Sequence, residues 1–179
     1  MRHRVRAFAH RVIEHAARHA PTGHGYATLA AISVLATWSL TIAVGPFLMA
    51  FCAAARTRWR AFTLIATLAT ALAAVALVRA LDVGFAPWIA AQAPELMQSV
   101  AWARLQGWIE QWGLAAMLLW LALPLPQVPF VLLAALLHVP SWAIFVAFVF
   151  GKGLKYAVEA YAAATGAQAV STLWRRWLT

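Results

Sequence analysis

Three prolines fall within six positions of a strongly apolar run, in the stretch Leu121–Phe130, LALPLPQVPF. Proline has no backbone N–H and disfavours helix at the residue before it, so a continuous helix cannot pass through this stretch. A second apolar run, Ala27–Ala55, is interrupted in the same way by Gly45-Pro46. Each run is therefore expected to fold as two short helices joined by a turn. The expected turn residues are Gly45, Pro46, Pro124, Pro126 and Pro129.

The composition indicates an integral membrane protein. Of the 179 residues, 64% are hydrophobic and 11% are charged, whereas a soluble domain is about half apolar and about a quarter charged. The formal charge of +9 comes largely from short arginine clusters beside apolar segments. This distribution is typical of membrane orientation and attraction to anionic lipids, not of nucleic-acid binding. Two unbroken apolar runs, Ala61–Leu81 and Trp142–Ala164, are each long enough to span a bilayer once.

The arginines favour re-entrant hairpins over membrane spans for the two broken runs. Five arginines precede Ala27–Ala55, and Arg56, Arg58 and Arg60 follow it. If that run crossed the membrane, these clusters would lie on opposite sides, against the positive-inside rule. If both broken runs instead enter and leave by the same face, every basic cluster lies inside, including the one in the tail. The sequence thus predicts a multi-pass protein whose N- and C-termini are both cytoplasmic.

The predicted fold class is an all-α integral membrane protein built as an inverted repeat. Each repeat is a re-entrant helical hairpin followed by a transmembrane helix, and the two repeats enter from opposite sides. Broken backbone at membrane depth is tolerated only where it packs inside the protein or lines a polar cavity. The predicted segments are a basic amphipathic interfacial helix (1–25), a membrane domain (26–165: hairpin 27–55, span 61–81, outer interfacial helix 95–112, hairpin 113–138, span 142–164) and a cytoplasmic amphipathic tail (166–179).

Two stretches of the membrane domain are similar to a known family. VGPFLMAFCAAARTRWRAFTLIATLATALAA resembles the first half of the DedA/VTT (SNARE-associated) membrane proteins, especially the small YqaA-like branch. PLPQVPFVLLAALLHVPSWAIFVAFVFGKGLKYAVEA resembles the second half, whose hairpin precedes a Gly-(Arg/Lys)-Gly-x-(Arg/Lys)-aromatic signature. Five residues match this signature: Gly151, Lys152, Gly153, Lys155 and Tyr156. The resemblance covers residues 38–165 and implies a bacterial inner-membrane protein that translocates or scrambles a lipid, or has an ion-coupled transport role in envelope maintenance.

The chain departs from the family pattern at three places. Family members often have an acidic residue in the first hairpin, but none occurs between residues 26 and 60. Alanine stands for glycine at Ala69, Ala73 and Ala74, and Val128 occupies a position where the branch often has a lysine. These departures argue most strongly against proton-coupled transport. They leave a second interpretation open, a degenerate family member that acts as a non-transporting membrane scaffold or assembly partner.

The predicted substrate pathway consists of three ionisable residues and their small or aromatic neighbours: Gly151, Lys152, Gly153, Lys155, Tyr156 and Glu159. The ionisable residues are spaced three and four apart, which places them along one side of a helix. Lys152 falls near the middle of the last span, where a charged group costs about 3 kcal/mol and usually faces a cavity or a partner. Both lysines are expected to receive a lipid phosphate at the hairpin tips. The alternative is that they reach toward cytoplasmic headgroups, with Lys155 paired to Glu159. Gly151 and Gly153 would allow close approach of another helix.

Arg79 and Asp82 end the first span three residues apart, a spacing that permits a local ion pair, which is favoured over a transport role. His138, at the end of the second hairpin, is expected to be an interfacial residue and not a proton carrier. Of the five histidines in the first 24 residues, His15 and His19 are the pair with helical metal-ligand spacing. A polar helix face is therefore favoured over a metal site for this segment. The segment is Arg-rich and nearly free of acids, so a mitochondrial presequence is an open alternative.

The sequence does not predict an enzyme. Its five acidic residues are scattered, and they do not assemble into paired carboxylates, a Ser-His-Asp set or a site beside a phosphate-binding glycine loop. No cofactor and no metal is predicted. The expected partners are membrane lipids with anionic headgroups and no nucleic acid, and a homo-oligomer is left open.

Overall fold

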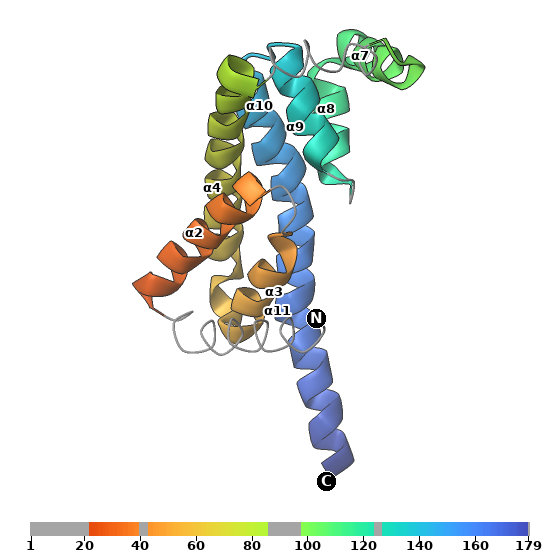
Figure 1. Ribbon diagram of the computed structural model, residues 1–179. Helices are drawn as coiled ribbons and strands as arrows, with labels where there is room; N and C mark the ends of the chain where they lie inside the picture. Colours follow the sequence, from red (N-terminus) through yellow and green to blue (C-terminus); the bar gives the residue numbers. More distant parts are fainter. Residues whose placement is uncertain (1–21, 40–42, 86–97, 124–126, 179) are drawn as a thin grey trace, which may run out of the picture. The chain divides into compact units, whose positions relative to one another are not determined.

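The computed structural model describes residues 22–39, 43–85, 98–123 and 127–178 (Figure 1). Most of the predicted interfacial helix 1–25, the start of the predicted helix 95–112, and the turn residues Pro124 and Pro126 lie outside the described residues. Within them the predicted all-α fold class is confirmed, since no strand occurs there. The elements are α2 (Gly23–Ser39), α3 (Gly45–Ala54), the 3₁₀ turn η1 (Arg56–Arg58), α4 (Trp59–Ala80), the π-helical turn η2 (Leu81–Phe85), α7 (Val100–Trp112), α8 (Leu114–Ala122), α9 (Gln127–Leu136), α10 (Ser141–Ala147), the π-helical turn η3 (Phe148–Lys152) and α11 (Gly153–Leu178).

The first broken run folds as two helices, as its Gly-Pro pair predicts. Pro46 lies in the first turn of α3, where the missing N–H would have no intrahelical acceptor in any case. α3 ends at Ala55, whose φ of −132° and ψ of 72° leave the helical region. α2 begins at Gly23, four residues earlier than the run predicts. The basic residues of η1 then lead directly into α4.

The second broken run also folds as two helices. α8 stops at Leu123, which has extended backbone with φ of −78° and ψ of 157°. This is the conformation that the ring of Pro124 imposes on the preceding residue. α9 then begins at Gln127 and contains Pro129 in its first turn, a position where proline is tolerated.

α9 ends in a left-handed cap formed by a residue other than glycine. The N–H of Val139 donates to the carbonyl of Ala134 at 3.0 Å, and the N–H of His138 donates to the carbonyl of Ala135 at 3.1 Å. These two bonds are those of a Schellman motif. His138 occupies its left-handed position with φ of 50°, and the cap directs the chain into α10.

Two helical stretches are long and apolar enough to cross a membrane, judged by length and composition. They are Arg56–Gly84, of 29 residues, and Ser141–Gly166, of 26 residues. The first includes the predicted span 61–81, and the second includes the predicted span 142–164. The segment 166–178, expected as a separate tail, continues α11 without a break.

The chain divides into two compact units. The first comprises residues 1–69 and 156–179, and the second comprises residues 70–155. The first therefore holds α2, α3, the beginning of α4 and most of α11, whereas the second holds the end of α4, α7 to α10 and the beginning of α11. Each unit thus combines one broken run with part of each long helix.

The core of the first unit is apolar and aromatic. Leu29 of α2, Phe51 of α3 and Phe62 of α4 are fully buried, and Tyr156 of α11 joins the same cluster. The rings of Phe51 and Phe62 meet edge to face with centroids 5.7 Å apart. Four helices of this unit are therefore joined through one cluster of side chains.

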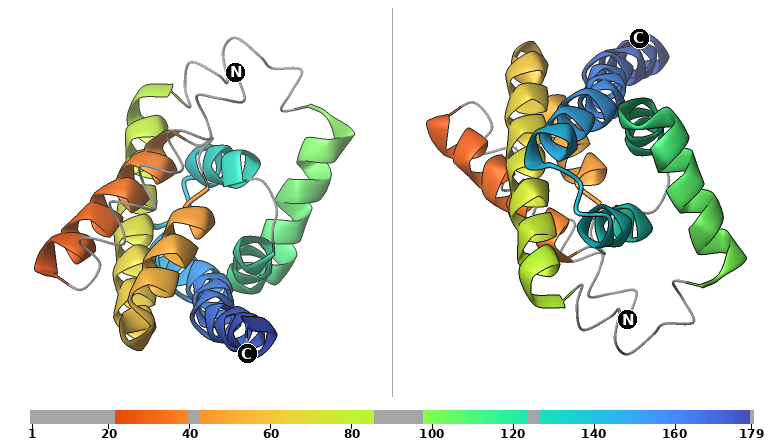
Figure 2. Two further views of the ribbon diagram at one scale, coloured as in Figure 1. Left: turned by 90° about the horizontal axis from the view of Figure 1, so that it is seen from below. Right: turned by 90° about the horizontal axis from the view of Figure 1, so that it is seen from above.

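The core of the second unit forms around η3. The ring of Phe148, in η3, meets that of Phe130, in α9, with centroids 5.8 Å apart. Leu121 of α8 and Ile144 of α10 are also buried. α8 packs against η3, and the two views of Figure 2 both show α8 alongside the blue helix that contains it. The second broken run is thus anchored on the turn that carries Lys152.

Candidate functional site

Lys152 is the only charged side chain that is buried among those the structure describes, with 7% of its surface exposed. It ends η3, a π-helical turn of five residues inside an otherwise α-helical stretch. Such turns occur frequently at functional sites because the extra residue changes the direction of the side chains. At a rise of 1.5 Å per residue, Lys152 lies about 16 Å from Ser141 and about 21 Å from Gly166. The charge is therefore far from both ends of the candidate span.

Gly151 brings α8 against the turn that holds Lys152. A β-carbon at Gly151 would lie 2.7 Å from Cβ of Leu121 and 2.9 Å from the carbonyl oxygen of Leu118. No side chain fits in this space, so the prediction that Gly151 admits a neighbouring helix is confirmed, and the neighbour is α8. Because α8 leads directly to Pro124, the Lys152 turn is fixed beside one arm of the second broken run.

Gln127 is a further polar residue of the same unit. It is not among the predicted site residues. Its Nε2 atom is buried and has no hydrogen-bond partner within the described residues. A buried amide nitrogen of this kind usually has a partner, so each exception points to strain, water or a ligand. The signal in the sequence is a lone amide side chain between Pro126 and Pro129 in an otherwise apolar run.

Glu159 belongs to the other unit, where it lies against the beginning of α3. A β-carbon at Gly45 would be only 2.5 Å from Oε2 of Glu159. The carboxylate thus lies at the N-terminal end of a helix, where the partial positive charge of the backbone favours an anion. An acidic group is therefore present beside the first broken run, supplied by α11 and not by the run itself.

The remaining predicted pathway residues divide between the units. Gly153 and Lys155 are partly buried and belong to the second unit, whereas Tyr156 is buried in the core of the first. Pro46 is exposed at the start of α3. The residues of the predicted pathway therefore lie in η3 and α11, but they contribute to separate cores.

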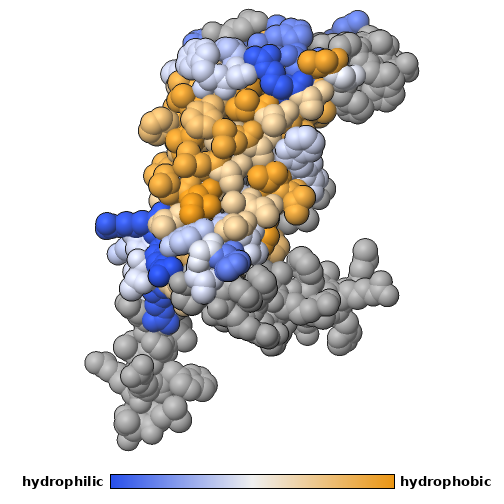
Figure 3. All heavy atoms as spheres, turned by 90° about the vertical axis from the view of Figure 1, so that its left-hand side faces the viewer, coloured by the Kyte–Doolittle hydropathy of each residue, from blue (hydrophilic) through white to orange (hydrophobic). Residues whose placement is uncertain are grey.

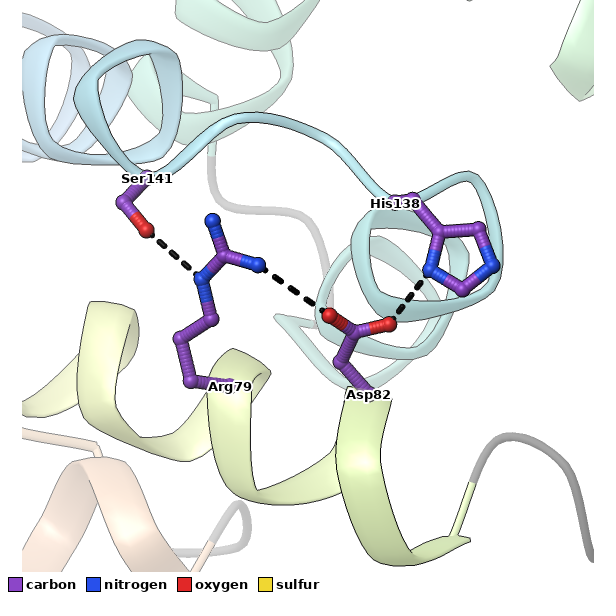
Figure 4. A network of polar contacts seen from close by, with 4 residues as sticks. All are labelled: Arg79, Asp82, His138 and Ser141. Carbon is purple, nitrogen blue, oxygen red and sulfur yellow. Dashed lines mark hydrogen bonds and ion pairs between the residues drawn. The ribbon is translucent and has the colours of Figure 1, made fainter.

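The predicted pair between Arg79 and Asp82 forms part of a larger network in the second unit (Figure 4). The Nη1 atom of Arg79 donates to Oδ2 of Asp82 at 3.1 Å, and its Nε donates to Oγ of Ser141 at 2.7 Å. Nδ1 of His138 lies 2.5 Å from Oδ1 of Asp82. Because an ionised carboxylate only accepts, Nδ1 carries the proton in this pair. The network joins the end of α4 to the cap of α9 and the start of α10.

Two hydroxyl groups in the middle of α4 differ from the others described in the helices. Ser33, Thr37 and Thr63 donate to the carbonyl four residues earlier, at 2.7–2.9 Å. Thr67 and Thr70 are 4% and 1% exposed, yet their Oγ1 atoms have no hydrogen-bond partner among the described residues. α4 thus carries, near its midpoint, two buried hydroxyl oxygens that no described residue satisfies.

Within the described residues, no group of three or more His, Cys, Asp or Glu side chains could hold a metal ion. Comparison of the chain with protein-family models, with curated proteins and with solved structures finds no match. The resemblance to the DedA/VTT family stays a prediction.

Proposed function

We propose that the chain is a multi-pass membrane protein of the bacterial inner membrane that moves a phosphate-bearing lipid from one leaflet to the other. The observation that carries the proposal is Lys152, a buried lysine in a π-helical turn near the middle of a candidate membrane span. An ionisable residue at such depth costs about 3 kcal/mol, and its retention usually reflects a substrate or ion pathway.

The exposed faces of the long helices support a lipid environment. Leu64, Leu68 and Leu72 recur every four residues on α4, and all three are exposed. Figure 3 shows hydrophobic side chains gathered over much of the face on which α4 lies in Figure 1.

The second long helix has a similar stripe. Phe150, Leu154, Val158 and Tyr161 are each more than half exposed. A stripe of this length is unfavourable in water and typical of a surface that contacts a membrane or another protein.

The composition of the two units supports an inverted repeat. Each unit holds one proline-broken helical run, the beginning of one long helix and a part of the other. In transporters with inverted repeats, broken helices meet near the bilayer midplane and form the substrate site there. We propose that the runs 27–55 and 113–138 are the broken elements of such a repeat, each entering and leaving by one face.

Lys152 would act as a point charge for the lipid phosphate. Its ammonium group has three N–H donors and no acceptor, and it pairs with phosphate oxygens at short distance. The amide of Gln127 would supply a second, neutral donor at the start of α9. The acyl chains would remain in the bilayer along the apolar stripes while the headgroup passes the charged residues Lys152 and Lys155.

A reconstituted-vesicle assay tests this function. A fluorescent phospholipid is distributed over both leaflets, and a membrane-impermeant reductant then quenches the accessible fraction. Wild-type protein should allow complete quenching, whereas Lys152→Met, which keeps the volume but removes the charge, should allow only the outer leaflet to be quenched. Lys155→Met should slow the exchange. Arg104→Met, an exposed change in α7, is the matched control and should behave as wild type.

One outcome would exclude the proposed lipid pathway. If folded Lys152→Met and Lys155→Met proteins both move lipid at the wild-type rate, neither lysine handles the phosphate. Folding of each variant is checked by its melting temperature and by size-exclusion chromatography in detergent.

The second candidate function is a membrane scaffold. It is favoured by a set of small side chains that are buried along α4: Ala66, Ala69, Ala71, Ala73 and Ala74. Close packing through small residues is a general means of helix association in membranes. An inactive wild-type protein that co-purifies with a stable partner would decide for the scaffold.

A further inference from the structure

We propose that Arg79 and Ser141 form a binding site for a phosphate group at the end of α4, separate from Lys152. The site belongs entirely to the second unit. It does not depend on lipid movement, because binding alone tests it. Its chemistry fits either a phospholipid headgroup or a free phosphate ion, and the experiment distinguishes the two.

The guanidinium of Arg79 is already held in one orientation. Its Nε donates to Oγ of Ser141 at 2.7 Å and its Nη1 donates to Oδ2 of Asp82 at 3.1 Å. Holding a long side chain in place before a ligand arrives lowers the entropic cost of binding. A planar guanidinium fixed in this way presents its remaining donors in a fork that suits phosphate oxygens.

Donors remain available at the exposed side of the network. The bonds drawn from Arg79 in Figure 4 start from Nε and Nη1, and no hydrogen bond joins its second terminal nitrogen, Nη2, to any described residue. The hydroxyl of Ser141 accepts from Arg79, so its own proton is free to donate to a ligand. Guanidinium and hydroxyl donors therefore lie side by side.

The one acid of the network does not block an incoming anion. The side chain of Asp82 is 13% exposed, whereas those of Arg79 and His138 are 48% and 74% exposed. Both oxygens of the carboxylate are also engaged, Oδ2 by Arg79 and Oδ1 by His138. A phosphate that approaches the exposed side of the network therefore meets the N–H groups of Arg79 and the O–H group of Ser141. The less exposed carboxylate of Asp82 orients the arginine.

The surroundings suit a lipid headgroup. Arg79 follows directly on the apolar part of α4, and no charged residue occurs between Arg60 and Arg79. Trp142 adjoins Ser141 and is 64% exposed, and Val83 adjoins Asp82 and is 82% exposed. Exposed tryptophan at the end of an apolar helix is typical of headgroup depth, where the phosphate of a phospholipid lies.

Binding is measured by isothermal titration calorimetry on the full chain in maltoside detergent, without phosphate buffer. The ligands are dihexanoyl phosphatidylglycerol below its critical micelle concentration, inorganic phosphate, and uncharged dihexanoylglycerol as the control. Wild-type protein should bind the phosphatidylglycerol and not the uncharged lipid. Phosphatidylglycerol bound about tenfold or more tighter than phosphate identifies a lipid site, and equal affinities identify a free-phosphate site.

Variants identify the residues. Arg79→Gln should weaken binding by about tenfold or more, because charge-assisted bonds are lost. Arg79→Lys should have an affinity between those of wild type and Arg79→Gln, since lysine keeps the charge but not the planar fork of donors. Ser141→Ala should weaken binding severalfold, and Arg104→Gln should bind as wild type. Unchanged affinity in both Arg79 variants, or no binding of either phosphate ligand by wild type, would overturn the site.

Discussion

The carboxylate of Glu159 lies over Gly45, so that a β-carbon at Gly45 would be 2.5 Å from Oε2. The two residues are far apart in the chain, one in α11 and the other at the start of α3. Their contact brings an acid to the broken run that has none of its own. A side chain at Gly45 would therefore have to displace the carboxylate of Glu159.

Gly45→Ala should lower the stability of the protein by about 1 kcal/mol, near the lower end of overpacking costs, because the flexible Glu159 can move partly aside. Gly23→Ala is the matched control. Gly23 is the first residue of α2 as Gly45 is of α3, and no atom of the described residues lies within 4 Å of the β-carbon that the substitution would add. Melting temperatures in detergent measure both. Adding Glu159→Ala to Gly45→Ala should restore stability, and a Gly45→Ala protein as stable as Gly23→Ala would contradict the contact.

Gly151→Ala should be the more damaging substitution. The added carbon would meet the backbone oxygen of Leu118 at 2.9 Å, and backbone cannot move aside as a side chain can. A loss of about 3 kcal/mol is expected, at the upper end of overpacking costs.

Gly166→Ala is the control in the same long helix. In the part of the chain that the structure describes, nothing lies within 4 Å of the added carbon. The variant should gain about 0.5–1 kcal/mol of stability, because alanine is the better helix former. Thermal unfolding that ranks Gly151→Ala at or above Gly166→Ala would exclude the close approach of α8.

The breaks of the helices could be predicted from local chemistry, but their contacts could not. Pro46 and Pro124 restrict the backbone of their immediate neighbours, and the structure has the predicted interruptions there. The contact of Glu159 with Gly45 and that of His138 with Asp82 join residues of different segments. Hydropathy along the chain carries no information on such pairings.

The site was predictable to a similar extent. A charge in an apolar span is costly, which singles out Lys152 in the sequence, and its burial agrees with that reasoning. The Arg79–Asp82 pair follows from spacing, while Ser141 and His138 join it only through the fold. Gln127 was missed because a single amide has no periodicity.

Thr70→Val should stabilise the protein or leave it unchanged. The substitution removes a buried hydroxyl whose oxygen has no partner among the described residues, and an unsatisfied buried group costs about 1–3 kcal/mol. Thr37→Val is the matched control, since Thr37 is also buried but donates to the carbonyl of Ser33 at 2.7 Å. It should show no comparable gain. A clear loss of melting temperature in Thr70→Val alone would mean that this hydroxyl has a partner in the native protein.

Asp82 and His138 should be energetically coupled. A double-mutant cycle with Asp82→Asn and His138→Ala is expected to give a coupling energy of about 0.5–1 kcal/mol, the range for a pair with an exposed member. Alanine is chosen because it keeps the left-handed strain that glycine would relieve at φ of 50°. Strictly additive effects on unfolding would show that the pair does not form.

The most direct test of the re-entrant arrangement is the side of the membrane on which the two ends of the run 27–55 lie. Cys52, which is buried, is replaced by alanine, and single cysteines are introduced at Thr22, Thr57 and Val83, which are all exposed. An impermeant maleimide is then applied to intact cells and to inverted vesicles. If the run is re-entrant, cysteines at positions 22 and 57 should label only in inverted vesicles, and the cysteine at position 83 only in intact cells. Labelling of Thr22 and Thr57 from opposite sides would contradict it.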